Sequence, residues 1–192
     1  MADPVETEYG ISAAELLEAV SHRFRAKVAL EGVVAEVQAH RKILAAYGAG
    51  LVDHFEVHDQ DGYADFTLHL KGRAEPIRVE CKNVRDSDEA YRDAGKIVAY
   101  KCETQKTRAS KGDPLSRYYS PSQFEILAVC LGKKTRQWSQ FMFVEVGHLS
   151  RHSTHSEKLA VMQRVPLPGS SNLAPWFDDL GKLLKEMSRR PA

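Results

Sequence analysis

The stretch 77–85, IRVECKNVR, places an acid and a lysine two residues apart at the end of a β-rich run. Residues two apart on a strand project to the same face of a sheet. Glu80 and Lys82 should therefore point together, whereas Val79 and Cys81 should point the other way, into packing. A strand that ends in a carboxylate and an ammonium side by side is a candidate for chemistry.

A second acid, Asp65, begins the strand predicted just before. An antiparallel hairpin between 65–70 and 77–82 would bring Asp65 close to Glu80. The sequence thus predicts two carboxylates and one lysine at one edge of a sheet. The alternatives are a turn residue for Asp65 and an exposed ion pair of little energetic value for Glu80 and Lys82.

Two neighbouring carboxylates repel each other unless a positive charge neutralises them. Mg²⁺ suits such a pair because it is bound by few carboxylates and keeps several waters. A bound divalent metal activates water and polarises a phosphoryl oxygen, and a nearby ammonium stabilises the charge that builds up on phosphorus. The predicted cluster is therefore typical of metal-assisted phosphoryl chemistry.

The elements that must position these residues can be predicted from apolar spacing. The first ten residues are expected to be a loose arm, and Ser12 with Glu15 forms a predicted capping box at the start of a helical region. The predicted elements, in chain order, are one bent helix or two helices over 11–47, strands over 52–57, 65–70 and 77–82, a helix over 88–108, strands over 124–131 and 141–146, a turn-rich segment over 147–172 and a helix over 173–189.

This order predicts one α/β domain over 1–192, built on a mixed central sheet flanked by helices. Its parts would be the arm (1–10), an N-terminal helical region (11–47), a catalytic core (48–146) and a C-terminal extension with a helix (147–192).

Asp65 followed by Glu80–Cys81–Lys82 after a hairpin, within an αβββαβ order, resembles the PD-(D/E)xK nuclease superfamily. That superfamily includes most type II restriction endonucleases and the Holliday-junction resolvases. The resemblance covers residues 24–146 and implies a restriction-endonuclease-like fold. It also implies Asp65, Glu80 and the Cys81 carbonyl as Mg²⁺ ligands and Lys82 as the catalytic lysine. Ala64 stands where the proline of the motif would be.

Members of this superfamily often add a further acid from the helix before the sheet. Glu31 fits this metal-ligand role best, because its helix face also carries Val28 and Val34. Glu36 is the substitute. The alternative for Glu31 is an ordinary solvated helix residue.

Basic and aromatic residues gather in two segments that could contact DNA phosphates and base edges. Gln105 shares a predicted helical stripe with Lys101 and Arg108, and by the same resemblance it would lie near the active site as a further catalytic residue. The candidate DNA contacts are Lys101, Lys106, Arg108, Lys111, Arg117, Tyr118 and Tyr119 in the first segment and Lys133, Lys134 and Arg136 in the second. The alternatives are a solvated helix end with its loop, and a plain hairpin tip.

The overall composition excludes a strongly basic nucleic-acid binder. Lys and Arg total 27 against 26 Asp and Glu, a formal net charge of +1, so any DNA contact must rest on local charge. The three widely spaced cysteines, Cys81, Cys102 and Cys130, are typical of reduced thiols in a cytoplasmic protein. The acidic, polar N-terminus is not typical of a signal peptide, and no apolar run is long enough to predict a membrane span.

A competing metal site consists of His148, His152 and His155, which would share one face of a helix. The segment around them is rich in serine and threonine, and no fourth ligand is evident, so this zinc site is not favoured.

These observations predict a Mg²⁺-dependent DNA endonuclease of the type II restriction class, with Mn²⁺ as a substitute metal. Double-stranded DNA would be its substrate, and a homodimer would supply one active site for each strand. A cognate methyltransferase would belong to the same system. The alternatives are a Holliday-junction or repair nuclease, a non-catalytic DNA-binding or assembly module on the same fold, and an unrelated protein with a surface ion pair.

Overall fold

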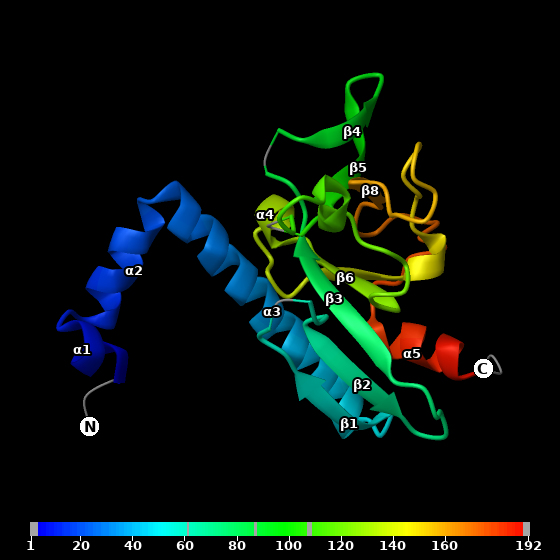
Figure 1. Ribbon diagram of the computed structural model, residues 1–192, viewed down its shortest axis with the longest axis horizontal. Coiled ribbons are helices and arrows are strands. Elements are labelled where there is room, and N and C mark those ends of the chain that lie inside the picture. Colours follow the sequence, from blue (N-terminus) through cyan, green and yellow to red (C-terminus); the bar gives the residue numbers. More distant parts are fainter. Residues whose placement is uncertain (1–3, 61, 87, 107–108, 190–192) are drawn as a thin grey trace. The chain divides into compact units, whose positions relative to one another are not determined.

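The computed structural model describes residues 4–60, 62–86, 88–106 and 109–189 (Figure 1). The chain divides into two compact units, residues 1–34 and residues 35–192. Within the described ranges, no helix combines the length and the apolar character that crossing a membrane requires.

The first unit is helical. It contains α1 (Pro4–Tyr9), α2 (Ala13–Ser21) and the start of α3 (Phe24–Gly48). The expected loose arm is therefore wrong for residues 4–9, which form α1, whereas residues 1–3 lie outside the described residues. The predicted capping box at α2 is present: the Glu15 amide donates to Oγ of Ser12 at 3.2 Å, and the Ser12 amide donates to Oε2 of Glu15 at 2.9 Å.

The second unit begins within α3, which ends at Gly48 as expected from the glycines there. Gly50 adopts a φ of +69°. The Leu51 amide donates to the Ala46 carbonyl, and the Gly50 amide donates to the Tyr47 carbonyl. This pair of bonds is a Schellman motif, which needs a residue that accepts positive φ.

A five-stranded sheet forms the centre of the second unit, in the order β1-β2-β3-β6-β7. All neighbours are antiparallel except β3 and β6, which are parallel, so the sheet is mixed. The predicted fold class, α/β with a mixed central sheet and flanking helices, is confirmed. The strand bounds are β1 (Val52–Val57), β2 (Phe66–Leu70), β3 (Ile77–Asn83), β6 (Ile126–Cys130) and β7 (Phe141–Glu145).

A second sheet has three antiparallel strands in the order β4-β5-β8. Short helical segments and one longer helix complete the unit. The bounds are β4 (Ala90–Asp93), β5 (Lys96–Glu103), β8 (Met162–Val165), the 3₁₀ turns η1 (Pro114–Arg117) and η2 (Val146–His148), α4 (Gly132–Thr135) and α5 (Leu180–Ser188).

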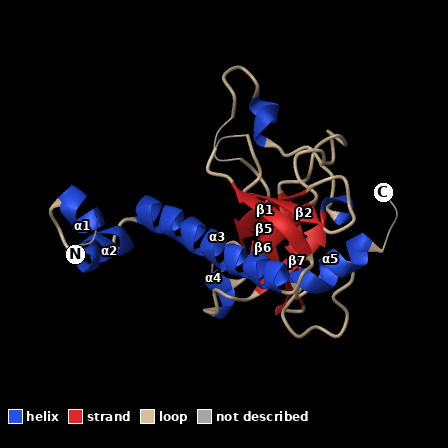
Figure 2. Cartoon of the chain, turned by 90° about the horizontal axis from the view of Figure 1, so that it is seen from below, coloured by secondary structure: helices blue, strands red, loops and turns tan. Residues whose placement is uncertain are grey.

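The two faces of the central sheet are covered differently. On one face, the later part of α3 and all of α5 pack against the strands (Figure 2). Ile43 of α3 and Leu183 of α5 are buried there with Cys81 of β3. On the other face, a second core joins Leu127 and Val129 of β6 to residues of the second sheet and its loops. The alternation along each strand assigns its residues to these two faces.

The helix predicted over 88–108 is wrong, because residues 90–103 form the β4–β5 hairpin. Ala94 and Gly95 both have positive φ at the turn, which no α-helix permits. The apolar stripe that suggested a helix includes Cys102, which β5 buries in the second core. The pairing that stabilises β5 comes from β8, a strand far along the chain that the sequence assigned to a turn-rich segment.

The connection between β6 and β7 is also more structured than a hairpin tip, since it contains the helical turn α4. Gly132 is buried in that turn. A Cβ atom on Gly132 would lie 2.6 Å from Cε3 of Trp138, a fused ring that cannot move aside as a flexible chain end could. The tight approach therefore requires glycine.

Gly132→Ala should destabilise the protein by about 1–3 kcal/mol, because the added methyl overpacks against Trp138. Gly147→Ala is the matched control: a Cβ there meets nothing within 4 Å, and its φ is not positive. Urea unfolding followed by circular dichroism would measure both. Equal stability of the two variants would show that the Trp138 contact does not constrain the α4 turn.

Candidate active site

A cleft of about 1050 Å³ opens beside β3, with Glu80 and Lys82 of β3 and Glu36 of α3 among the residues that line it. It is lined largely by polar side chains, all of them from the second unit. The lining residues are Glu36, His58, Asp59, Gln60, Gly62, Tyr63, Ala64, Asp65, Glu80, Lys82, Lys106, Ala109, Ser110, Tyr119 and Gln123.

Two backbone contacts hold Asp65, one with β3 and one with the residue after β1. The Cys81 amide donates to Oδ2 of Asp65 at 2.6 Å, and the Asp65 carbonyl accepts from the His58 amide at 2.9 Å. The β2–β3 register, with Phe66 opposite Val79, explains this placement, because Asp65 immediately precedes Phe66. The structure therefore brings Asp65 to the Glu80–Cys81 segment, as the hairpin in the sequence predicts.

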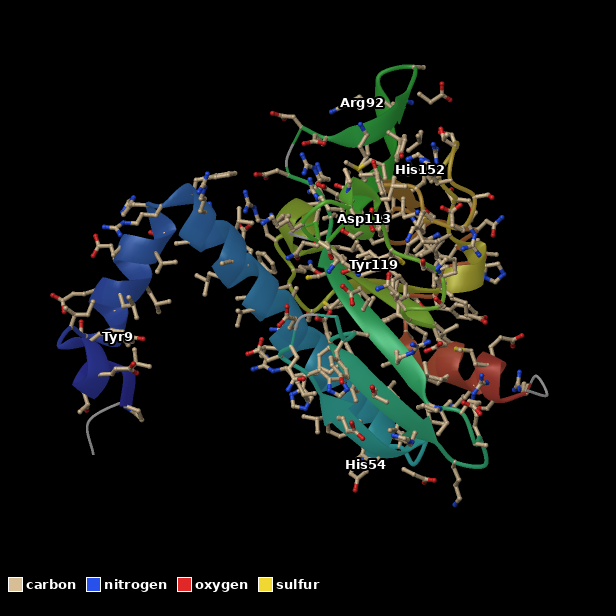
Figure 3. The ribbon with its side chains drawn as sticks, viewed as in Figure 1. Tyr9, His54, Arg92, Asp113, Tyr119 and His152 are labelled. Carbon is tan, nitrogen blue, oxygen red and sulfur yellow. The ribbon has the colours of Figure 1, made fainter. Side chains whose placement is uncertain are left out.

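Glu80 is a buried carboxylate, with 4% of its surface exposed. Its Oε1 atom accepts from Nζ of Lys82 at 2.5 Å and from the hydroxyl of Tyr119. The same ammonium lies 5.4 Å from the centre of the Tyr119 ring. Figure 3 locates Tyr119 beside β3. Such pairing is what a buried charge requires, because desolvation without a partner costs several kcal/mol.

The surroundings of the cluster shift the pKa values of its members in different directions. Burial, and then the charge of Glu80, raise the pKa of Asp65 to about 7, against the opposing effect of Lys82. Burial alone would lower the pKa of Lys82, but Glu80 and the other neighbouring negative groups raise it overall. Burial raises the pKa of Tyr119 as well. At neutral pH, Lys82 is thus an ammonium and Tyr119 a neutral phenol, whereas Asp65 exchanges its proton.

The two carboxylates suit a hard cation. Oδ1 of Asp65 and Oε2 of Glu80 accept no hydrogen bond from the described residues. Within the described part of the chain, no group of three or more His, Cys, Asp or Glu side chains is arranged to hold a metal. This donor set fits Mg²⁺, which takes one or two carboxylates and completes its shell with waters and substrate oxygens.

The three histidines of the competing zinc site do not converge. His148 lies in η2, and His152 and His155 lie in the loop after it, not on one helix face. The His152 and His155 rings lie 5.1 Å apart, and Nδ1 of His152 accepts from the backbone amides of Thr154 and His155. The described residues thus hold no zinc site there.

The helix acid in the cleft is Glu36, the substitute of the sequence prediction. Burial raises the pKa of Glu36; Lys82 opposes this shift, whereas Asp59 and Glu80 add to it. Glu31 belongs to the unit of residues 1–34, whereas every lining residue belongs to the other unit. Both acids lie on α3, little more than one turn apart, so helix periodicity alone could not choose between them.

Of the predicted DNA contacts, Lys106 and Tyr119 line the cleft. Nζ of Lys106 lies 5.7 Å from the centre of the Tyr119 ring. Arg117 is close to Lys106, because its Nε donates to the Lys106 carbonyl at 3.4 Å. Tyr119 is also the main member of the cluster whose role the sequence did not identify, since 39 residues separate it from Glu80.

The other predicted contacts lie elsewhere. Arg117 and Tyr118 line a neighbouring pocket of about 500 Å³ that shares Ala109 and Ser110 with the cleft. Gln105, which was predicted as a catalytic residue near the active site, lines this neighbouring pocket and not the cleft. The exposed Lys111 lies in the same loop region. Arg108 lies outside the described residues.

The helical stripe expected to carry Lys101 and Gln105 is wrong, because Lys101 lies on β5, with Nζ 5.4 Å from the centre of the Tyr91 ring.

The second basic segment lies in and just after α4. Lys133 and Lys134 belong to α4, and Arg136 follows with a φ of +60°. Nζ of Lys134 donates to the Asp86 carbonyl and lies 5.9 Å from the centre of the Tyr100 ring. None of the three lines the cleft.

Comparisons with known proteins were made on sequence and on structure. No protein-family model matches the chain, and no curated protein matches it significantly. A solved structure of a bacterial homing endonuclease, I-Ssp6803I, is similar with a TM-score of 0.45 and 16% sequence identity, over 76% of this chain and 82% of that one. A similarity at that TM-score does not support a functional assignment.

The raised pKa of Asp65 makes the stability of the metal-free protein depend on pH. Between 3.8 and about 7, the folded state holds a proton on Asp65 that the unfolded state has released. The free energy of unfolding should therefore fall as pH rises through this window, by about 1.4 kcal/mol for each pKa unit.

Asp65→Asn should lack this fall, while its amide oxygen can still accept from the Cys81 amide. Urea unfolding in EDTA at several pH values would measure the difference between the two proteins. Asp93→Asn, in the exposed end of β4, is the control. A pH profile of Asp65→Asn parallel to that of the wild type would contradict the shift.

Proposed function

We propose that this protein is a metal-dependent endodeoxyribonuclease that hydrolyses phosphodiester bonds in DNA. One observation carries the proposal: Asp65, Glu80 and Lys82 converge in a single open cleft, with two carboxylate oxygens that accept no hydrogen bond from the described residues. The cleft has room for a phosphodiester, and its lining also contains the ammonium of Lys106.

Each residue of the cluster has a distinct role in this proposal. Asp65 and Glu80 would hold Mg²⁺, or Mn²⁺ in its place, and the Cys81 carbonyl is a further proposed ligand. When bound, the metal supplies Lewis acidity and an activated water. The ammonium of Lys82, fixed by Glu80, stabilises negative charge that develops on the phosphoryl oxygens. Glu36 is a third acid at the rim of the site, in place of Glu31.

Tyr119 acts in this proposal through Glu80. Its hydroxyl and the Lys82 ammonium share Oε1 of Glu80, which leaves Oε2 for the cation. The ammonium groups of Lys82 and Lys106 also lie near the ring, 5.4 Å and 5.7 Å from its centre. Tyr119 is therefore a positioning residue, not the DNA contact that the sequence suggested.

We extend the proposal to a type II restriction endonuclease that acts as a homodimer beside a cognate methyltransferase. The support is the resemblance of the Asp65 and Glu80–Cys81–Lys82 motif to PD-(D/E)xK nucleases. A cut through both strands of a duplex also requires two active sites, which a two-fold dimer supplies.

Glu80→Gln and Lys82→Ala should each lower DNA cleavage by at least about 100-fold, because each removes part of the charge arrangement around the reacting phosphate. Cleavage of mixed-sequence plasmid DNA with Mg²⁺ and with EDTA would be followed on gels. Lys185→Ala is the control, since this exposed residue lies on α5 and does not line the cleft.

Discrete bands that EDTA and Glu80→Gln abolish would support a sequence-specific nuclease. A smear with the same dependence would replace the restriction role by a non-specific or repair role. If Glu80→Gln and Lys82→Ala each cleave DNA at the rate of the wild type, the assignment of the active site is overturned.

Tyr119→Phe keeps the ring but removes the hydroxyl that Oε1 of Glu80 accepts from. A hydrogen bond to a charged group contributes about 1.5–3 kcal/mol, so cleavage at low Mg²⁺ should fall by roughly 10- to 100-fold. Titration of Mg²⁺ should show half-maximal activity at a higher concentration than in the wild type. Tyr47→Phe, an exposed residue of α3 whose ring contacts Phe55 and does not line the cleft, is the matched control. A lower kcat with an unchanged Mg²⁺ requirement would contradict the positioning role.

A further inference from the structure

Two loops are joined next to the cleft. The first loop covers residues 109–120 and contains η1, and the second loop covers residues 149–159. The Leu159 amide donates to the carbonyl of Tyr119 at 2.8 Å, and Tyr119 lines the cleft. Figure 3 locates His152 on the second loop. The second loop, which the sequence left without a favoured function, therefore borders the candidate active site.

Charged side chains of both loops lie close to the residues that line the cleft. In the first loop, Nε of Arg117 donates at 3.4 Å to the carbonyl of Lys106, a cleft residue. In the second loop, Nζ of Lys158 donates to Oγ of Ser120 at 3.4 Å. The Ser120 amide donates at 2.8 Å to Oε1 of Gln123, which also lines the cleft. The two cations are thus each connected to the wall of the cleft.

Positive charge predominates in this region. The basic residues of the two loops, together with Lys106, are Lys106, Lys111, Arg117, Arg151 and Lys158, and the acidic residues are Asp113 and Glu157. None of these basic side chains forms a salt bridge with a described residue, whereas Arg78 and Arg85 of the same unit pair with glutamates. The whole chain has a formal net charge of only +1, so this excess is local. A local excess of unpaired cations attracts a polyanion.

His152 adds a hydrogen-bond donor of fixed orientation to the second loop. Its Nδ1 atom accepts from the backbone amides of Thr154 and His155 at 3.1 and 3.2 Å. A ring nitrogen that accepts carries no proton, so the proton of the neutral imidazole is on Nε2. The ring is in edge contact with that of Tyr118, with centres 4.9 Å apart. The Nε2–H group can therefore donate to an oxygen of a bound ligand.

We propose that the loop surface formed by Lys106, Arg117, His152 and Lys158 binds the sugar–phosphate backbone of duplex DNA next to the cleft. The inference rests on the proposed nuclease function, and it adds the second loop to the DNA contacts that the sequence predicts. Lysine, arginine and N–H donors make most protein contacts to DNA phosphates, which fix the position of the duplex. DNA that is held at this surface places a neighbouring phosphodiester in the cleft.

A purely structural role explains the loop surface less well. The backbone bond of Leu159 and the burial of its side chain already hold the second loop in place. The cations add no salt bridge to this packing, and like charges that gather on one surface repel each other. A zinc site at the histidines is not formed by the described residues either. A bound polyanion accounts for the excess of charge and for its position beside the cleft.

The test removes two of the cations and keeps side chains that can donate hydrogen bonds, in Arg117→Gln/Lys158→Gln. Lys71→Gln/Lys185→Gln is the matched control, because it loses the same charge at exposed positions that line neither the cleft nor the neighbouring pocket. Binding of a fluorescein-labelled duplex, taken from plasmid DNA that the wild type cleaves, would be measured by anisotropy in EDTA at several salt concentrations. Thermal unfolding would confirm that both variants are folded.

The logarithm of the binding constant falls with the logarithm of the salt concentration by about 0.9 for each phosphate that the protein neutralises. The slope of Arg117→Gln/Lys158→Gln should therefore be shallower than that of the wild type by about 1.8. Its affinity should be at least about 10-fold weaker at low salt. The control variant should keep both the slope and the affinity of the wild type.

Glu157→Gln changes the charge of the loop surface in the opposite direction. The side chain of Glu157 is 64% exposed, and its carboxylate lies 3.9 Å from Nδ1 of His155. Loss of this acid should tighten DNA binding by about 2-fold or more, because it removes a repulsion from the phosphates. A folding defect would not tighten binding. Glu75→Gln, at an exposed position outside the loops, is the control and should bind as the wild type does.

The outcomes separate the loop surface from the proposed function. If the wild type cleaves DNA but Arg117→Gln/Lys158→Gln binds it with the affinity and salt slope of the control, the loop surface does not bind DNA, and the proposed function stands. If the wild type binds the duplex through these two residues but does not cleave it with Mg²⁺, the loop surface is supported and the nuclease function fails. If the wild type neither binds nor cleaves any duplex, both fail.

Discussion

The buried carboxylate of Glu80 is the constraint on which the site depends. A carboxylate with 4% exposure must be paired, and two donors from different parts of the chain meet on its Oε1 atom. Lys82 comes from the same face of β3, and Tyr119 comes from the loop before β6. This pairing closes one side of the cleft, fixes the ammonium and leaves the second oxygen of Glu80 available. The need to pair the buried Glu80 carboxylate thus explains both the wall of the cleft and the arrangement of its charged groups.

The parallel pairing of β3 with β6 divides the central sheet into two halves. From β6 onward, the face away from the helices is covered by the second core, which buries Leu127 and Val129. On the side of β1 and β2, the same face remains polar and open. β3 lies at the boundary and carries Glu80 and Lys82 on this face, so the cluster is buried enough to shift pKa values and open enough to admit a substrate.

The local features of the fold could be predicted because each depends on neighbours in the sequence. The Ser12–Glu15 capping box, the glycine end of α3 and the five strands of the central sheet follow from short-range periodicity and turn chemistry. The approach of Asp65 to Glu80 could also be predicted from neighbours in the sequence, because a single hairpin joins the two residues. The β4–β5 hairpin could not be predicted in this way, since its stability comes from the distant strand β8 and from a turn with positive φ.

For the site, the sequence by itself determined the side chains of the central cluster, because alternation along one strand places Glu80 and Lys82 on the same face. Only the tertiary structure decided what surrounds them. It brought Tyr119 to Glu80, and it placed Glu36, not Glu31, as the helix acid of the cleft. It also placed Gln105 in the neighbouring pocket and left His54 and His69 exposed beside Glu56. The physical reason is that long-range packing decides which faces are buried, and periodicity within one element cannot show what another element covers.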